Sequence, residues 1–411
     1  MFVVNGQRND MNRYNECYSR CRISNYNSEG VLTVLDSDGE LLECNNTFYE
    51  VWCRLDGKTK TSSVVKEILN QYDVSNHDEI REDVMNVIDD MLKYGLINKD
   101  NNILPQINHV ENCILSSHIA ITSCCNLNCS HCYLDHKNHS SITANEFEMV
   151  LRNLAQNGIL TIEMSGGEPL THSQCLNFLR RAKEYGFYIK LFTNATLINS
   201  ANLDNLKKYV DCFRVSLDGG ERVHDLRRGR GTFSKTLYAL QLLRNCKVQI
   251  SMTVDDNNYS DIDIVRRISD ELGMRFELSP VVPYPHLQIP FDKLKFIQEQ
   301  INKSLLDKMG SDSKRANIQG INCEAAIRLL YINSQLDVFP CPLLYNGKWF
   351  VGNLRNASLQ ELLNCENYKK VVRSLNRLKT KCVACNKCQY WCAAIVEQTK
   401  DKRSPFCSWK R

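Results

Sequence analysis

A short cysteine loop constrains this chain more than any other feature. Cys125, Cys129 and Cys132 form a C-x3-C-x2-C motif directly after a run of strand-forming residues, 119–122. Three thiolates can bind three irons of a [4Fe–4S] cube and leave the fourth iron without a protein ligand. Clusters that only carry electrons usually have four cysteine ligands, so an open iron implies that another molecule binds there. A zinc loop or a set of buried free thiols is the alternative interpretation.

Length, charge and cysteine content limit the class of protein. A chain of 411 residues is long for a single core, so two or three domains are expected. The net charge of +4 does not call for a nucleic-acid or membrane partner, and no apolar run approaches the ~18 residues that span a bilayer. The first residues lack the pattern of a secretory signal, and clustered cysteines in such a chain indicate metal rather than disulfides. We therefore expect a cytoplasmic protein.

Residues 1–100 have the pattern of a small winged-helix-like domain. Asp38-Gly39 is the expected hairpin turn between its second and third strands. The last predicted helix repeats apolar residues with the helical period. The expected strands and then helices are residues 22–26, 31–36, 41–44, 46–55, 62–72 and 78–94.

Parts of this domain, above all residues 39–45 and 91–97, resemble the PqqD-like family of peptide-recognition domains. The resemblance implies that an exposed strand beside a helix captures the leader of a ribosomally made precursor peptide as an added strand. A DNA-binding winged helix shares this layout, and an iron–sulfur DNA-binding regulator is therefore the alternative function. Acidic residues on the third helix would repel a phosphate backbone, which favours peptide over nucleic acid: Asp78, Glu79, Glu82, Asp83, Asp89 and Asp90.

After a polar linker, 101–115, strands and helices alternate through residues 116–310. Strands are expected at 119–122, 160–164, 188–192, 212–216, 248–253 and 276–278, and helices at 144–156, 173–185, 201–209, 233–245 and 259–272. This alternation predicts an α/β domain with parallel pairing, right-handed crossovers and an outer layer of helices. Six units are too few for a closed eight-unit barrel, so we predict a partial (β/α)6 barrel with its ligand at the carboxyl ends of the strands.

Short polar motifs follow the second, third and fourth of these strands. They are Ser165-Gly166-Gly167-Glu168-Pro169, Thr193-Asn194-Ala195 and Val215-Ser216-Leu217-Asp218-Gly219. Together with the cysteine loop, they resemble the radical S-adenosylmethionine (SAM) enzymes, with Ala195 where the family has glycine. The resemblance implies that the cofactor is bound by Gly166, Gly167, Glu168, Asn194, Ser216 and Arg228.

The chemistry of these residues agrees with that assignment. Gly166 and Gly167 let backbone approach a ligand, and Glu168 offers an acceptor for an ammonium group. By resemblance, Ser216 and Arg228 contact the ribose and carboxylate end of SAM, and a guanidinium suits a carboxylate. The alternative for Arg228 and its basic neighbours is a solvated loop.

Residues 311–411 lose the alternation and gain cysteines. A hairpin at 329–332 and 337–339 and a helix at 359–374 are expected. Seven cysteines resemble the SPASM extension of radical SAM peptide maturases: Cys323, Cys341, Cys382, Cys385, Cys388, Cys392 and Cys407. Leu336 stands where that family usually has glycine, and the x2 gap between Cys385 and Cys388 is shorter than usual. A zinc ribbon with stray thiols is the alternative.

By this resemblance, Cys323, Cys341 and Cys392 hold an inner auxiliary [4Fe–4S] cluster, and the other four hold an outer one. With the cluster of the core, the chain would carry three [4Fe–4S] clusters and bind SAM. The remaining cysteines are interpreted as small buried hydrophobic residues: Cys17, Cys21, Cys44, Cys53, Cys113, Cys124, Cys175, Cys212, Cys246 and Cys365.

The predicted function is maturation of a ribosomally synthesised peptide by a 5′-deoxyadenosyl radical. A Cys thioether of the sactipeptide or ranthipeptide type is the first choice of product, and a carbon–carbon or carbon–oxygen crosslink is the second. Formylglycine is not expected, because Pro342 stands where sulfatase-maturating relatives have Asp. The expected partners are the precursor peptide and an electron donor such as flavodoxin or ferredoxin. A purely electron-carrying protein is a further alternative, against which the strand-end motifs argue.

Overall fold

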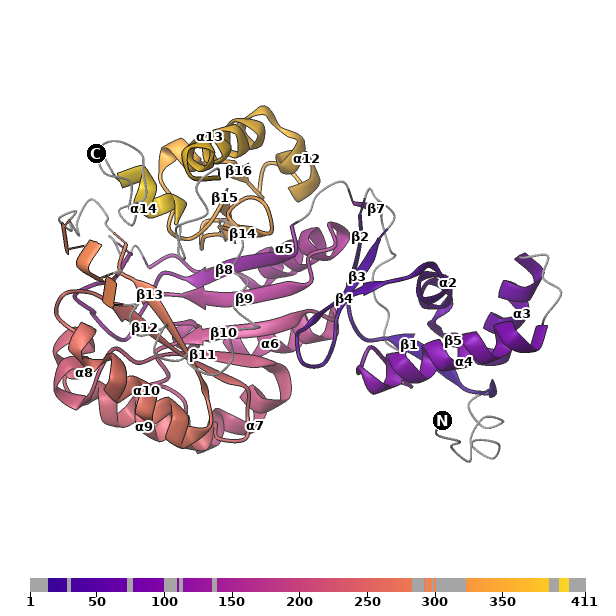
Figure 1. Ribbon diagram of the computed structural model, residues 1–411, viewed down its shortest axis with the longest axis horizontal. Helices are drawn as coiled ribbons and strands as arrows, with labels where there is room; N and C mark the ends of the chain where they lie inside the picture. The colour runs from indigo at the N-terminus through magenta and orange to yellow at the C-terminus, as the bar shows by residue number, and fades with distance from the viewer. Residues whose placement is uncertain are drawn as a thin grey trace. The chain divides into compact units, whose positions relative to one another are not determined.

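The structure is a computed structural model, and it describes residues 14–27, 31–71, 77–99, 109–110, 114–134, 139–282, 292–293, 295–297, 299–300, 323–383 and 392–398. The chain divides into two compact units (Figure 1). The first contains residues 1–115 with the segments 148–162 and 180–188, and the second contains the rest. Among the described residues, no helix is long and apolar enough to cross a membrane.

The first unit begins with short strands and helices that form the expected winged-helix-like domain. Its elements are β1 (Cys17–Arg20), β2 (Ser24–Asn27), β3 (Leu32–Leu35), β4 (Leu41–Cys44), α2 (Asn46–Arg54), β5 (Asp56–Lys60), α3 (Thr61–Gln71), α4 (His77–Lys93), β6 (Ile97–Asn98) and β7 (His109–Val110). They give a sheet of order β4-β3-β2-β7 and a sheet of order β5-β1-β6. The predicted strands and helices are present, with ends shifted by one or two residues.

The predictions missed β1 and β5. Neither carries a strong strand signal, and β5 reads Asp-Gly-Lys-Thr-Lys. The two strands exist because they pair antiparallel with each other, Cys17 opposite Lys60 and Ser19 opposite Asp56. This is a tertiary effect that local propensity does not report.

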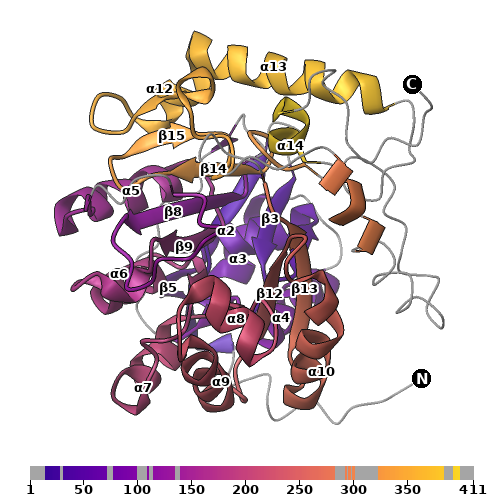
Figure 2. The same cartoon turned by 90° about the vertical axis from the view of Figure 1, so that its left-hand side faces the viewer.

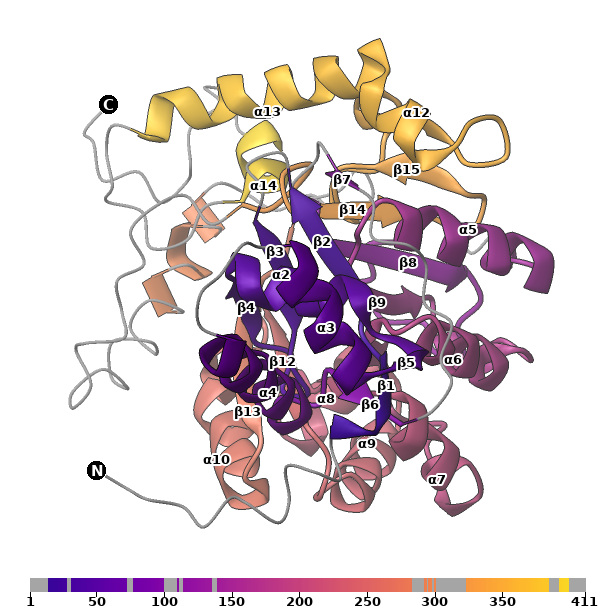
Figure 3. The same cartoon turned by 90° about the vertical axis from the view of Figure 1, so that its right-hand side faces the viewer.

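The core of this domain is centred on Trp52, which is fully buried. The Asn45 side chain caps α2 by accepting the amide of Phe48, and the Trp52 indole donates to the Ser24 hydroxyl (3.1 Å). Helices α2, α3 and α4 pack together (Figure 3). Helix α4 buries Val84 and Ile88, one helical turn apart, and leaves its acidic residues on the other faces.

The predicted alternation of strands and helices is confirmed in the second part of the chain. Its elements are β8 (Ser116–Thr122), α5 (Ala144–Gln156), β9 (Thr161–Gly166), η1 (Pro169–Thr171), α6 (Cys175–Glu184), β10 (Tyr188–Thr193), α7 (Ser200–Tyr209), β11 (Cys212–Ser216), α8 (Glu221–Arg228), α9 (Thr232–Leu242), β12 (Val248–Val254), η2 (Tyr259–Asp261), α10 (Ile262–Leu272) and β13 (Arg275–Pro280). Strands β10 to β13 pair in parallel in chain order. Helices α7, α9 and α10 lie on the outer side of the curved sheet (Figure 2).

The C-terminal segment extends the same sheet. It contains β14 (Leu329–Ile332), β15 (Asp337–Phe339), η3 (Gly347–Trp349), β16 (Gly352–Asn353), α12 (Leu359–Asn364), α13 (Glu366–Val383) and α14 (Ala393–Gln398). Strand β14 pairs in parallel with β8, so the full order is β13-β12-β11-β10-β9-β8-β14-β15-β16. The predicted hairpin is confirmed, but its pairing with β8 was not predicted.

Two further predictions need correction. The single helix expected at 359–374 is two helices, because the backbone of Cys365 is extended and ends α12 before Glu366 begins α13. Helix α8 was not predicted, since its eight residues are strongly polar and repeat no apolar period. The proposed domain boundaries at residues 100, 115 and 310 stay predictions.

Two of the family's glycine positions that this chain fills with other residues keep a left-handed backbone. Ala195 has φ of 61° and Leu336 has φ of 66°. Both side chains are fully buried. A left-handed conformation costs roughly 1–2 kcal/mol for a residue other than glycine. The backbone conformation therefore favours glycine at these positions. Ala195 and Leu336 lose that conformational preference but bury an apolar side chain.

Leu336 gives a test of this balance. Leu336→Ala should lower the unfolding temperature, and Leu336→Gly should lower it no further, because glycine relieves a left-handed strain of about 1 kcal/mol. At Leu330, which is equally buried but lies in β14, Gly should be worse than Ala by about 0.5–1 kcal/mol. Thermal unfolding of the four variants measures both orders. The same order at both positions would contradict the strain argument.

Candidate functional site

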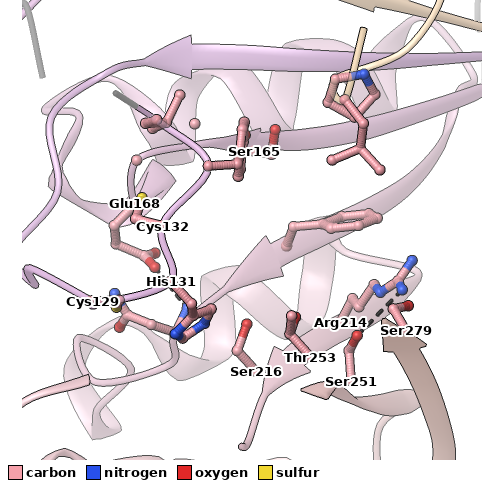
Figure 4. A pocket seen from close by; sticks show the side chains of 18 of the residues that line it. Cys129, His131, Cys132, Ser165, Glu168, Arg214, Ser216, Ser251, Thr253 and Ser279 are labelled. Carbon is pink, nitrogen blue, oxygen red and sulfur yellow. Dashed lines mark hydrogen bonds between the residues drawn. The ribbon is translucent and has the colours of Figure 1, made fainter. Parts of the chain in front are cut away.

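One cavity gathers the residues that the sequence singled out. It has a volume of about 440 Å³ in the second unit and lies inside the partial barrel. Its lining includes all three cysteines of the loop and all six predicted cofactor-binding residues, Gly166, Gly167, Glu168, Asn194, Ser216 and Arg228. Figure 4 shows Cys129, Cys132 and His131 at one end and Arg214, Ser251 and Ser279 at the other.

The cysteine loop is ordered by its own backbone and by helix α8. The amide of Cys132 donates to the Cys129 carbonyl (3.2 Å), and the amide of Ser130 donates to the Arg227 carbonyl (3.0 Å). The positive charge of Arg228 lies close enough to Cys129 and Cys132 for these thiolates to raise the pKa of the guanidinium, although burial opposes this. Arg228 therefore places a positive charge beside the cysteines of the loop, and iron is bound by the thiolate form of cysteine.

The loop residues fit an iron–sulfur cube. Among the described residues, no three His, Cys, Asp or Glu side chains converge on a point suited to one metal ion. A cube does not need such convergence, because each cysteine binds a different iron. Nδ1 of the buried His131 has no hydrogen-bond partner in the described part of the chain and belongs to the cavity lining. A polar group bound in the cavity would supply that partner.

Gly166 and Gly167 are required by the close approach of β8 and the cysteine loop. Gly166 has φ of 149°, and a Cβ on it would lie 2.2 Å from the Thr122 carbonyl oxygen. A Cβ on Gly167 would lie 2.3 Å from the carbonyl oxygen of Cys124. The amide of Gly167 donates to the Thr122 carbonyl, and that of Glu168 to the Cys124 carbonyl. The two glycines thus fasten the end of β9 to the start of the cysteine loop.

Glu168 joins the ends of β9 and β10. Its carboxylate accepts the Thr193 hydroxyl (2.8 Å), the Asn194 amide (2.7 Å) and the Leu170 amide (3.2 Å). Burial raises the pKa of Glu168 to about 7, although these three donors favour the ionised form. The side chain of Asn194 in turn donates to the Asn126 side chain (2.9 Å), which connects β10 to the cysteine loop.

Asp218 is fully buried and forms the electrostatic centre of the site. Its Oδ2 lies 2.6 Å from Arg228 Nε, 3.2 Å from His131 Nε2 and 3.7 Å from Arg227 Nε. Its Oδ1 accepts the Thr253 amide (3.0 Å). Burial opposes ionisation, but the Arg228 and His131 charges hold the pKa of Asp218 well below its usual value. Sequence reasoning quoted Asp218 without a role, since a buried ion pair has no local signature.

The alternative of a solvated basic loop is wrong for two of the arginines. Arg227 is buried and Arg228 is only partly exposed within α8, and the Arg227 guanidinium also contacts Asp255 and the Thr253 carbonyl (3.1 Å for the carbonyl). Arg230, in contrast, is exposed. Both guanidinium groups reach Asp218 through their long side chains, from adjacent positions of α8.

Cys323, Cys341 and Cys392, the predicted ligands of the inner auxiliary cluster, lie near one another. Burial raises the pKa of Cys341 well above its usual value, and the nearby thiolates of Cys392 and Cys323 raise it further. A cationic cluster would reverse this effect by binding the thiolates. Cys341 also lines the main cavity. Cys382 lies in α13, while Cys385, Cys388 and Cys407 fall outside the described residues.

Comparison with known protein families agrees with this geometry. The model of the Radical SAM superfamily matches residues 119–268. The chain is a radical SAM enzyme. The model described as coenzyme PQQ synthesis protein D (PqqD) matches residues 29–97, and the SPASM model, an iron–sulfur cluster-binding domain, matches residues 323–389. The predicted combination of domains is confirmed, and it is that of the peptide-modifying radical SAM enzymes.

Similar proteins span most of the chain. The antilisterial bacteriocin subtilosin biosynthesis protein AlbA of Bacillus subtilis is 26% identical over 91% of this chain and 90% of its own length. The sporulation killing factor maturation protein SkfB of the same species is 24% identical over 56% of this chain and 60% of its own length. The crystal structure of Streptococcus suis SuiB bound to S-adenosylmethionine covers 96% of this chain and 100% of that one, with a TM-score of 0.64. At 16% identity, that likeness shows the fold.

Asp218 generates a prediction on the stability of this radical SAM core. Asp218→Asn removes the charge that neutralises two buried guanidinium groups, and breaking a buried pair costs about 3–5 kcal/mol. We expect a lower unfolding temperature and less iron retained in the core. Asp263→Asn is the matched control, because Asp263 pairs with Arg266 at an exposed site and its loss costs about 0–1 kcal/mol. Equal unfolding temperatures and iron contents for the two variants would refute the role of Asp218.

Proposed function

We propose that this enzyme matures a ribosomally synthesised peptide by joining a cysteine sulfur to a carbon of the same peptide, a thioether of the sactipeptide or ranthipeptide type. One observation carries the proposal: Cys341, an expected ligand of an auxiliary cluster, lines the same cavity as the cysteine loop. A peptide segment in that cavity would lie between the two cluster sites. A carbon–carbon or carbon–oxygen crosslink is the second candidate, since the same geometry serves it.

The choice of a peptide substrate has two supports. The PqqD domain presents short strands beside helices, a layout that suits capture of a precursor leader as an added strand. AlbA is named for biosynthesis of the bacteriocin subtilosin and SkfB for maturation of the sporulation killing factor, and one SuiB crystal structure is of the complex with precursor peptide SuiA. The acidic exposed face of α4 is unfavourable for DNA, so a DNA-binding regulator is the weaker candidate.

Each strand-end residue has a role in this proposal. Cys125, Cys129 and Cys132 would hold the core [4Fe–4S] cluster. Gly166 and Gly167 position the loop that carries Glu168, which would accept from the amino group of SAM. Ser216 and Asn194 would contact its polar groups, and Arg228 its carboxylate end. When bound, SAM and the cluster supply a 5′-deoxyadenosyl radical that takes a hydrogen atom from the core peptide.

The auxiliary sites complete the set of three clusters that we propose. Cys323, Cys341 and Cys392 would hold the inner cluster, and Cys382, Cys385, Cys388 and Cys407 the outer one. Seven cysteines cannot supply eight ligands, so one inner iron would be open to a soft ligand such as a substrate thiolate. Low-potential clusters need a reductant such as flavodoxin or ferredoxin, and a reducing cytoplasm would keep the cysteines available.

The function is tested with a precursor peptide, which is to be sought as a short cysteine-containing product of a neighbouring reading frame. The dithionite-reduced enzyme should make 5′-deoxyadenosine and a product lighter by two hydrogen atoms for each crosslink, with the sulfur blocked to alkylation. A precursor with serine in place of cysteine should not lose these hydrogens. If it does, the crosslink joins carbon to carbon or oxygen.

Replacing Cys125, Cys129 and Cys132 together with Ala should abolish 5′-deoxyadenosine while the auxiliary iron remains. Cys124→Ala is the matched control. Cys124 is adjacent in sequence but contacts His139 Nδ1 (3.5 Å) and lies outside the motif. Parent-level 5′-deoxyadenosine from the triple variant would refute the assigned core cluster.

Glu168 gives a pH prediction for cofactor binding. With a pKa raised to about 7, its ionised fraction rises as the pH increases from 6 to 8. The Glu168 carboxyl group should therefore bind the cationic or N–H donor group of SAM more weakly at pH 6 than at pH 8. The SAM dissociation constant of Glu168→Gln divided by that of the parent enzyme should increase about tenfold from pH 6 to pH 8. Equilibrium dialysis of the holoenzyme measures it, and a ratio independent of pH would count against Glu168 as the acceptor.

A further inference from the structure

The interior of the partial barrel carries several polar side chains at positions that a closed barrel fills with apolar ones. Interior positions of closed barrels are dominated by Val, Ile and Leu. Here the cavity is lined by His118 of β8, Glu163 and Ser165 of β9, and Arg214 of β11. Apolar burial alone does not account for charged and hydrogen-bonding side chains at these positions.

His118 forms the centre of a chain of three polar side chains. Its Nδ1 lies 3.2 Å from Glu163 Oε2, and its Nε2 lies 2.5 Å from the Ser165 hydroxyl. The ring packs edge-on against Phe192, with the ring centres 4.9 Å apart, and against Tyr331 of β14 at 5.7 Å. His118 and Ser165 are nearly inaccessible to bulk solvent but belong to the cavity lining. The imidazole is therefore held in one orientation.

The direction of the hydrogen bonds follows from the ionisation of Glu163. Burial opposes its ionisation, but the hydrogen bond from His118 and the positive charges of Lys190 and Arg214 hold the pKa of Glu163 below its usual value. An ionised carboxylate can only accept, so His118 Nδ1 carries the shared hydrogen. In the neutral ring Nε2 is then an acceptor, and the Ser165 hydroxyl donates to it.

We infer that His118, oriented by Glu163, is the base that takes up the proton released when the crosslink forms, with the Ser165 hydroxyl as the relay to the cavity. The inference rests on the proposed function. The peptide C–H hydrogen atom would leave to the 5′-deoxyadenosyl radical. The S–H bond of the cysteine would break to give the thiolate that forms the S–C bond. The proton would go through Ser165 to His118 Nε2, and the electron left over when the S–C bond forms would go to an oxidised auxiliary iron–sulfur cluster.

The other titratable groups of the cavity are less suited to this role. Glu168 already accepts three hydrogen bonds from the ends of β9 and β10. His131 contacts Asp218 and Arg228 and lies inside the cysteine loop. Glu163 is itself the partner of His118, and Lys190 is 3.7 Å from its other oxygen. On taking a proton, the imidazole would become a cation directly beside the Glu163 carboxylate, as in Ser-His-Asp sites.

The test uses the holoenzyme and its cysteine-containing precursor. His118→Gln should lower the ratio of crosslink to 5′-deoxyadenosine by about 100-fold, the usual contribution of a general base. The dissociation constant of the precursor and the iron content should stay at the parent values. Ser165→Ala, which changes the packing little, should lower the ratio in the same direction.

A control and a direct readout separate this role from a structural one. His172→Gln should keep the parent ratio, because the Nε2 of His172 contacts the Ile142 carbonyl (3.0 Å) away from the cavity lining. Nuclear magnetic resonance of ¹⁵N-histidine-labelled holoenzyme gives the direct readout. The His118 signal is assigned as the one absent from the spectrum of His118→Gln, and it should show hydrogen on Nδ1 and none on Nε2.

Two outcomes would overturn the inference. Crosslinking by both His118→Gln and Ser165→Ala with the parent ratio of crosslink to 5′-deoxyadenosine would do so while leaving the proposed function intact. A parent enzyme that makes 5′-deoxyadenosine but never a thioether would refute the proposed function, and the inference would fall with it.

Discussion

The buried carboxylate of Asp218 is the interaction on which the site depends. It follows β11 and contacts Arg228 of α8, His131 of the cysteine loop and the amide of Thr253 in β12. Four segments that are distant in sequence are thus fixed by one side chain. A buried charge is tolerated because its partners surround it, and removing it would leave Arg228 without its carboxylate partner. The geometry of the cysteine loop is therefore coupled to the ends of strands far along the chain.

A second carboxylate, Glu168, does the same for the other side of the site. It joins β9 to β10, while Gly166 and Gly167 bring the backbone of β9 onto the end of β8. The two carboxylates differ in charge balance. Asp218 faces cations and stays ionised, whereas Glu168 faces neutral donors and burial raises its pKa to about 7. Glu168 is consequently the member of the pair whose affinity for a donor group can depend on pH near neutrality.

The sequence predicted the elements that have strong local signals, and missed those that arise from pairing. The six strands and the helices of the core follow from alternation, and the three cysteines from their spacing. Strands β1 and β5 and helix α8 carry no apolar period, so pairing or burial decides them. The predicted cofactor residues line one cavity, but Asp218, His118 and Glu163 went unassigned, because partners far along the chain give them their roles.

The parallel pairing of β14 with β8 gives the cavity its two ends. Tyr331 lies opposite His118, and the antiparallel β15 places Phe339 opposite Tyr331. From His118, β8 runs about 13 Å to Thr122 and the cysteine loop, at 3.3 Å per residue. From Phe339, the chain runs the other way to Cys341. His118 thus lies between the cysteine loop, near which a hydrogen atom would leave the peptide, and Cys341, near which an auxiliary cluster would accept the electron. A proton acceptor for the same bond-forming step would be needed between them, and this register supplies the position.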